Sequence, residues 1–145
     1  GVSLAGCLTI DGPCPDLDAF NETGVWITDI PGLPANHLRY PDLLETLDIP
    51  DRERGTLSLK PEYCERIMAA KDRMLRVGRW KLVYQPLESG YALRLFDIVT
   101  DPTCQRDVSN EHPDVTADLW TKLQLFVDTN MPQTTTSPQA GQNRQ

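Results

Sequence analysis

Histidine and cysteine are scarce in this chain, and neither residue type forms a metal-binding pattern. The 145 residues include two histidines and four cysteines, with no Cys-x-x-Cys pair. Zinc centres need closely spaced cysteines and histidines, and calcium loops need several carboxylates at fixed spacing around a glycine. Because both patterns are missing, we predict that this chain supplies no metal ligand and holds no cofactor.

Long apolar runs and clustered basic residues are also lacking. No run approaches the roughly 20 apolar residues that span a bilayer, and the first residues do not resemble a signal peptide. The formal net charge of −7 disfavours nucleic acid, because contacts to phosphates need clustered lysine and arginine. We therefore expect neither a membrane segment nor a nucleic-acid partner.

The sequence leaves the cellular compartment open, with an exported or periplasmic location slightly favoured. Cys7 and Cys14 could close a short disulfide in an oxidising compartment, although two reduced thiols are the interpretation that we favour. The chain begins at Gly1 without an initiator methionine, which suggests that it is cut from a longer polypeptide.

Residues 66–98 carry the clearest strand signals. Within residues 80–84, large apolar side chains recur at every second position and therefore share one face of a strand. A glycine at position 78 and a Ser-Gly pair at 89–90 supply tight turns on either side. These signals predict a three-stranded antiparallel meander formed by residues 73–76, 80–84 and 93–98.

The segment before this meander is harder to assign. Pro61 suits the first turn of a helix, and residues 62–70 are good helix formers, so propensity alone predicts a helix. We nevertheless expect extended chain from about Arg66 onward, because the hairpin needs a partner strand. Further upstream, the Pro- and Gly-rich residues 31–50 predict an irregular segment, with a helical turn or two at 42–47.

The last ordered element is predicted to be a helix that opens at Pro113. Acidic residues at positions 114 and 118 suit its positive end. Apolar side chains then recur at helical spacing and mark one stripe. The members of this stripe are Val115, Leu119, Leu123, Phe126 and Val127. We expect the stripe to pack against the sheet.

These elements together predict the α+β fold class. The prediction is a small antiparallel sheet of three to four strands, packed against one C-terminal helix and preceded by a long irregular N-terminal segment. Residues 1–128 form this domain. Residues 129–145 are rich in Thr, Gln, Pro and Asn, so we expect a disordered polar tail.

No motif for catalysis is present, and basic residues are the only functional candidates. The sequence has no Gly-x-Ser-x-Gly turn, no P-loop and no dinucleotide fingerprint, so we predict no catalytic residue. His37 and Arg39 lie two residues apart in the long loop, where they could meet an anionic group. Lys71 and Arg73 begin a basic strip with the same potential. For both pairs, an ordinary surface or interface role is the more common outcome.

Several short segments share one known pattern in both order and spacing. The longest reads Arg-Val-Gly-Arg-Trp-Lys-Leu-Val-Tyr at residues 76–84, and Leu-Phe-Asp-Ile follows at 95–98. The others are Gly-Val-Ser-Leu at 1–4, Ala-Phe-Asn-Glu-Thr-Gly at 19–24, Asp-Pro at 101–102 and His-Pro at 112–113. Over about residues 1–128, the pattern resembles the C-terminal subdomain of the sulfatase family, within the alkaline-phosphatase-like superfamily.

This resemblance implies the same sheet and helix, and it places the catalytic groups outside this chain. Sulfatases use a formylglycine matured from a Cys/Ser-x-Pro-x-Arg motif, which residues 14–18 do not match. The carboxylates that hold calcium in the family also lie upstream. The implied parent is a sulfuric ester hydrolase whose upstream catalytic domain, with calcium and formylglycine, is the partner of this chain.

What the resemblance carries over is architectural. The subdomain is expected to complete the hydrolase fold and to help wall its substrate cleft, without being catalytic by itself. On charge grounds alone, we predict that the cleft-facing, substrate-binding residues are His37, Arg39, Lys71 and Arg73. The alternative is an independent binding or interaction module without enzymatic activity, with the apolar loop at residues 25–40 as its contact surface.

Overall fold

The computed structural model describes residues 4–8, 15–24 and 30–130 of the chain. Of the tail expected at residues 129–145, residues 131–145 lie outside the described residues, and the first two positions belong to the C-terminal helix. Cys14 also lies outside the described residues, so the expected state of the Cys7 and Cys14 pair is not tested.

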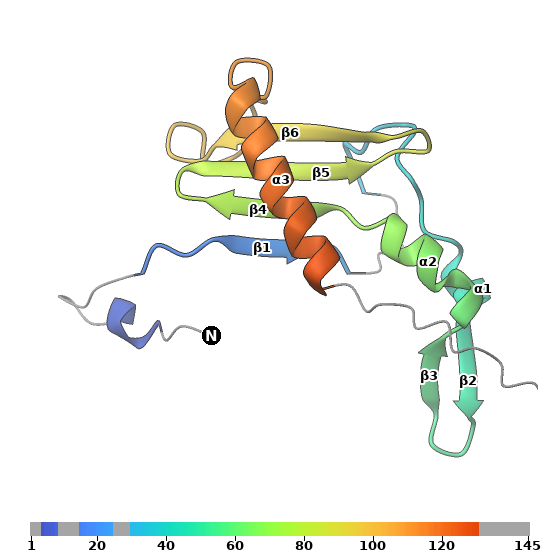
Figure 1. Ribbon diagram of the computed structural model, residues 1–145. Coiled ribbons are helices and arrows are strands. Elements are labelled where there is room, and N and C mark those ends of the chain that lie inside the picture. Colours follow the sequence, from blue (N-terminus) through green and yellow to red (C-terminus); the bar gives the residue numbers. More distant parts are fainter. Residues whose placement is uncertain (1–3, 9–14, 25–29, 131–145) are drawn as a thin grey trace, which may run out of the picture.

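The α+β fold class is confirmed: an antiparallel sheet of four strands is covered on one face by a C-terminal helix (Figure 1). The helix is α3 (Pro113–Asn130), which crosses the sheet diagonally. In spatial order, the strands are β1 (Ala19–Glu22), β4 (Arg73–Val77), β5 (Trp80–Pro86) and β6 (Tyr91–Asp97). The last three form the expected meander, and β1 adds the fourth strand at its edge.

The core lies between this sheet and α3. Leu75, Leu82 and Leu95 occupy one register line across β4, β5 and β6, and all three are buried. Leu119 and Leu123 of α3 are four residues apart, on one side of the helix, and they belong to the same buried cluster. The apolar side of the strands and the apolar stripe of the helix therefore pack against each other, as predicted.

The turns of the meander depend on glycine. Gly78 lies in the two-residue connection between β4 and β5 with a φ of 54°. Gly90 adopts a φ of 85° just before β6. Residues that carry a Cβ rarely adopt such positive φ values. These glycines therefore allow the chain to reverse direction within a few residues.

The expectation of extended chain from Arg66 is wrong. Residues Pro61–Ala69 form the helix α2, with proline in its first turn, and strand structure begins only at Arg73. The segment can form the helix that its residues favour, because β1 already pairs with β4 along Ala19–Glu22. Since the free edge of β4 is taken by a strand from about 50 residues upstream, the preceding segment is not needed as a partner.

A second, two-stranded sheet was not predicted. It is formed by β2 (Leu47–Asp51) and β3 (Thr56–Leu59), which follow the short helix α1 (Leu43–Thr46) at the position expected for a helical turn. Figure 1 shows this hairpin projecting away from the main sheet. The N-terminal segment adds a single 3₁₀ turn, Ala5–Leu8.

An ion pair closes the end of the meander and makes a pH prediction possible. Arg79 in the β4–β5 turn pairs with Asp97 at the end of β6, with its Nε 2.9 Å from Asp97 Oδ1. The hydrogen bond from Arg79, helped by those from Thr100 and the Val99 amide, holds the pKa of Asp97 well below its usual range. The folded state therefore resists protonation of this carboxyl.

We expect the free energy of unfolding to fall more steeply on acidification in the wild type than in Asp97→Asn. A lowered pKa contributes stability above the pKa of the unfolded chain, about 4, and this contribution is lost as the pH falls toward the folded value. Urea titrations between about pH 6 and pH 2 measure the difference. The control, Asp18→Asn at an exposed site before β1, should keep the wild-type slope. Parallel curves for wild type and Asp97→Asn would contradict the prediction.

Candidate functional site

His37 is buried in the structure and ties the long loop to the sheet. Its side chain is 0% exposed, and its Nε2 lies 2.6 Å from Asp72 Oδ1. Its backbone forms an isolated bridge with Leu87 beside the end of β5, and the Leu38 amide donates to Pro86 O at 2.9 Å. The imidazole thus helps to hold the loop in place on the sheet.

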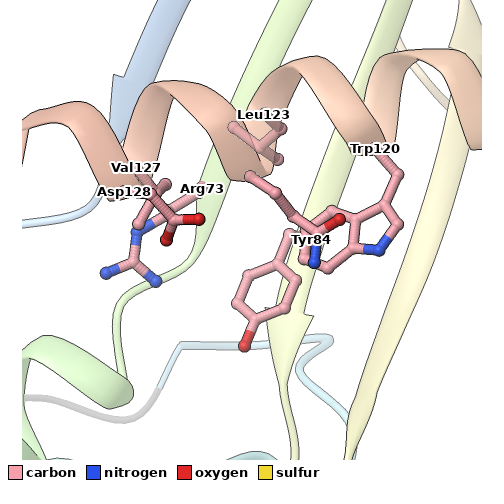
Figure 2. A pocket seen from close by; sticks show the side chains of 7 residues that line it. Arg73, Tyr84, Trp120, Leu123, Val127 and Asp128 are labelled. Carbon is pink, nitrogen blue, oxygen red and sulfur yellow. The ribbon is translucent and has the colours of Figure 1, made fainter.

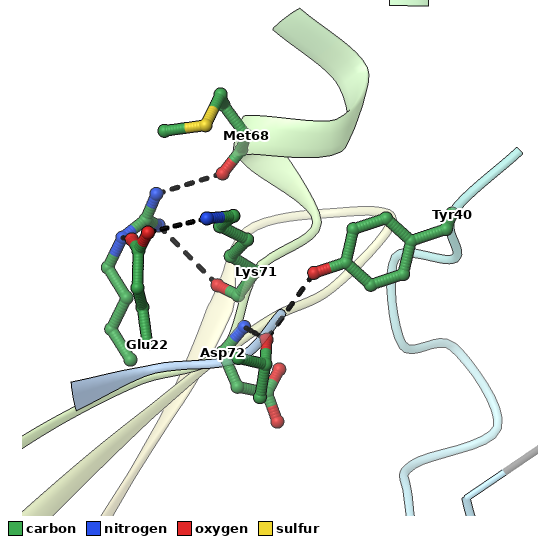
Figure 3. A network of polar contacts seen from close by, with 7 residues as sticks. Glu22, Tyr40, Met68, Lys71 and Asp72 are labelled. Atoms are coloured by element: carbon green, nitrogen blue, oxygen red, sulfur yellow. Dashed lines mark hydrogen bonds and ion pairs between the residues drawn. The ribbon is translucent and has the colours of Figure 1, made fainter. Parts of the chain in front are cut away.

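Lys71 and Arg73 converge on the carboxylate of Glu22 in β1, and Figure 3 shows Lys71 beside Glu22. Glu22 is the register partner of Arg73 across the β1–β4 pair. Its Oε1 accepts from Lys71 Nζ at 2.5 Å, and its Oε2 lies 3.7 Å from Arg73 Nε. The Arg73 guanidinium also donates to the Met68 carbonyl at the end of α2, at 2.8 Å. Antiparallel pairing therefore brings these three charges together.

Tyr40 and Thr23 extend this polar network toward the loop. The Tyr40 hydroxyl lies 3.3 Å from Thr23 Oγ1, which accepts from the Asp72 amide at 3.1 Å. The Thr23 amide in turn donates to the Asp72 carbonyl at 3.0 Å. Burial raises the pKa of Tyr40, so the phenol is neutral at pH 7 and serves as a hydrogen-bonding group.

Arg39 lies in a different environment from its neighbour His37. Its side chain is exposed, while its backbone carbonyl accepts from Arg66 Nε at 3.3 Å. The structure therefore brings together three of the four predicted residues, His37, Lys71 and Arg73. Whether any of the four contacts a substrate stays a prediction.

Sequence reasoning did not assign a role to Glu22, Thr23 or Tyr40. Glu22 and Thr23 stand at the end of a short strand, and only its pairing with β4 places them beside Lys71 and Asp72. Tyr40 follows Arg39 in the same loop, but no sequence pattern indicated that its hydroxyl would contact Thr23. The missing information was the cross-strand register, which local periodicity does not contain.

The arrangement holds the loop at residues 30–42 and the sheet together through side-chain contacts. Among residues 4–8, 15–24 and 30–130, no group of three or more His, Cys, Asp or Glu side chains is placed to share a metal ion.

Comparison with known proteins found no matching family model, no matching curated protein and no matching solved structure. In the part of the chain that the structure describes, no helix has the length and apolar character needed to cross a membrane.

Proposed function

We propose that this chain is the C-terminal accessory subdomain of a sulfatase-type hydrolase. In this role it completes the fold of an upstream catalytic domain and helps wall the substrate cleft, without being catalytic itself. The observation that carries the proposal is an apolar surface on the projecting β2–β3 hairpin, which nothing in the described chain covers. The order of the sequence segments and the sheet-and-helix fold support it.

The hairpin and the helix before it expose several large apolar side chains. Leu57 is 62% exposed and Ile49 is 47% exposed, and Leu44 in the adjoining helix is 83% exposed. Alternation places Leu57 and Leu59 on the same side of β3. Two-stranded hairpins are marginal in water unless their apolar side packs on another element, and contiguous apolar patches mark interaction surfaces. A catalytic domain packed against this side would provide that cover.

The polar network around Glu22 and Asp72 is consistent with an accessory role. His37, Lys71 and Tyr40 each contact a side chain of this chain, so the network locks the loop at residues 30–42 to the sheet. A rigid loop of this kind suits the wall of a cleft, where fixed geometry reduces the entropy lost when a ligand binds.

The proposal predicts that the reaction belongs to a longer polypeptide. The chain alone should not hydrolyse an aryl sulfate, whereas the product that includes the coding region upstream of Gly1 should do so and should contain a Cys/Ser-x-Pro-x-Arg motif. The control is that longer product with the motif Cys or Ser changed to Ala. Turnover by the chain alone, or an upstream region without a catalytic domain, would refute the proposal.

A matched pair of hairpin variants tests the docking surface within the longer product. Leu57→Lys places a charge on the apolar side of β3 and should lower both the melting temperature and the activity. Ser58→Lys places the same charge on the other side, opposite Asp48, where opposite charges attract, and should lower neither. Equal effects of the two substitutions would show that the apolar side is not the docked surface.

The second candidate is an independent binding or interaction module. It predicts that the native chain alone exposes no adhesive apolar surface and melts cooperatively as a monomer. Binding of a hydrophobic dye to the native chain distinguishes the two. The exposure of Leu44, Ile49 and Leu57 favours the accessory subdomain.

A further inference from the structure

A groove runs beside Arg73, at the end of the sheet where α2 and α3 come close. It consists of two hollows of about 540 and 180 Å³ that share Arg73, Tyr84 and Val127 as lining residues. The larger volume is within the range of about 300–1,000 Å³ typical of small-molecule sites. Figure 2 shows the smaller hollow, with Arg73 on one side and Tyr84 and Trp120 on the other, beneath α3.

Most of the groove lining is apolar. Leu38, Met68, Pro86 and Leu87 line the larger hollow. In the smaller one, the Tyr84 and Trp120 rings are stacked, with centroids 5.3 Å apart and an interplanar angle of 5°. Such a surface favours an aliphatic or aromatic body over a fully polar ligand.

Arg73 is the exception, because it places a buried positive charge at the junction of the two hollows. The residue is 8% exposed, and its hydrogen bonds go to the carbonyls of Met68 and Lys71, which carry no charge. Its Nε is buried and has no hydrogen-bond acceptor among the described residues. A buried charge is costly unless it is paired.

The nearest carboxylate does not balance this charge. Glu22 Oε2 is 3.7 Å from Arg73 Nε, but Glu22 Oε1 is 2.5 Å from Lys71 Nζ. Two cations therefore share this carboxylate, and the next one along the chain, Asp72, has its Oδ1 2.6 Å from His37 Nε2. Glu65 and Asp128 also line the groove. Both are exposed to water, and neither forms an ion pair with Arg73 in the described part of the chain.

We propose that this groove binds an amphipathic monoanion of small-molecule size. Its carboxylate or sulfate head would pair with Arg73, and its aliphatic or aromatic body would lie along the apolar lining between α2 and the β5–β6 turn. The Tyr84 ring, 6.0 Å from the guanidinium carbon of Arg73, flanks the head group. The proposal concerns this chain by itself and does not depend on an upstream catalytic domain.

Calorimetric titration of the 145-residue chain with three octyl compounds tests the head group. Octyl sulfate, octyl glucoside and octyltrimethylammonium share the same body and are used below their micelle-forming concentrations. Octyl sulfate should bind at least about tenfold more tightly than the other two, because hydrogen bonds between ions are the strong ones. Equal affinities, or tighter binding of the cation, would overturn the proposal.

Two substitutions of alanine by phenylalanine test the location of the site. Ala69 is an exposed residue of α2 that lines the larger hollow, so Ala69→Phe should fill it and weaken octyl sulfate binding at least about tenfold. Ala117→Phe makes the same change at an exposed position of α3 outside the groove and should leave binding unchanged. Arg73→Gln should abolish the preference for the anionic head. If that variant does not fold, the Ala69→Phe result decides, and unchanged binding there refutes the site.

Discussion

Leu123→Ala is expected to lower the free energy of unfolding by about 2–5 kcal/mol, the range for truncating a buried leucine. Leu123 is 0% exposed and belongs to the cluster between α3 and the sheet. Alanine would leave a cavity bordered by the leucines of three strands, and β-strands relax little to fill such a space. Because domains of this size have a net stability of about 5–15 kcal/mol, the loss is a large part of the total.

The matched control is Leu125→Ala, two residues along the same helix. Leu125 is 67% exposed, so the same truncation should change the free energy of unfolding by less than about 0.5 kcal/mol. Urea denaturation followed by circular dichroism measures both. Similar effects of the two substitutions would show that α3 does not pack on the sheet by the side that carries Leu119 and Leu123.

This pair also shows which part of the fold was accessible from the sequence. The apolar stripe of α3 and the alternation in β5 are local patterns, and each fixes the buried side of its own element. Gly78 and Gly90 mark the turns because their backbone angles favour glycine. The meander and its covering helix could therefore be predicted in order and approximate position.

Long-range pairing could not be predicted in the same way. The partner of β4 is β1, about 50 residues earlier in the chain, and no local pattern indicates this. For that reason, a strand was expected near Arg66, where α2 continues to Ala69. The β2–β3 hairpin could not be predicted because Pro50 argues against a strand and the apolar–polar alternation of β3 covers only four residues. Asp51 accepts hydrogen bonds from the amides of Glu53 and Arg54 in the turn between the two strands.

The candidate site depends on the same missing information. Charge predicted that His37, Lys71 and Arg73 could meet anionic groups, and the structure gives all three a carboxylate neighbour from this chain. The partners Glu22 and Asp72 become neighbours only once β1 and the loop at residues 30–42 are placed on the sheet. Lys71 and Arg73 share the same carboxylate, Glu22.

Arg73→Met is expected to lower the free energy of unfolding by about 2 kcal/mol. The substitution keeps most of the apolar stem but removes the donor to the Met68 carbonyl and the neighbour of Glu22. Removing one partner of a fully buried ion pair costs about 3–5 kcal/mol, and we expect less here because the Glu22 side chain is 34% exposed. Arg76→Met, at an exposed position of the same strand, should cost less than about 0.5 kcal/mol. Urea denaturation of both variants provides the measurement.

A double-mutant cycle with Glu22→Gln separates the two ways in which Arg73 could act. If its charge matters through Glu22, Arg73→Met and Glu22→Gln should be non-additive, with a coupling of about 0.5–1 kcal/mol. The physical reason is that Glu22→Gln leaves Lys71 and Arg73 as two neighbouring cations without a carboxylate, and Arg73→Met relieves that repulsion. Strict additivity would mean that Arg73 stabilises the fold through the Met68 carbonyl alone. In that case, the end of α2 is fixed to the sheet by a hydrogen bond whose donor happens to be charged, and the positive charge of Arg73 beside the groove does not itself stabilise the fold.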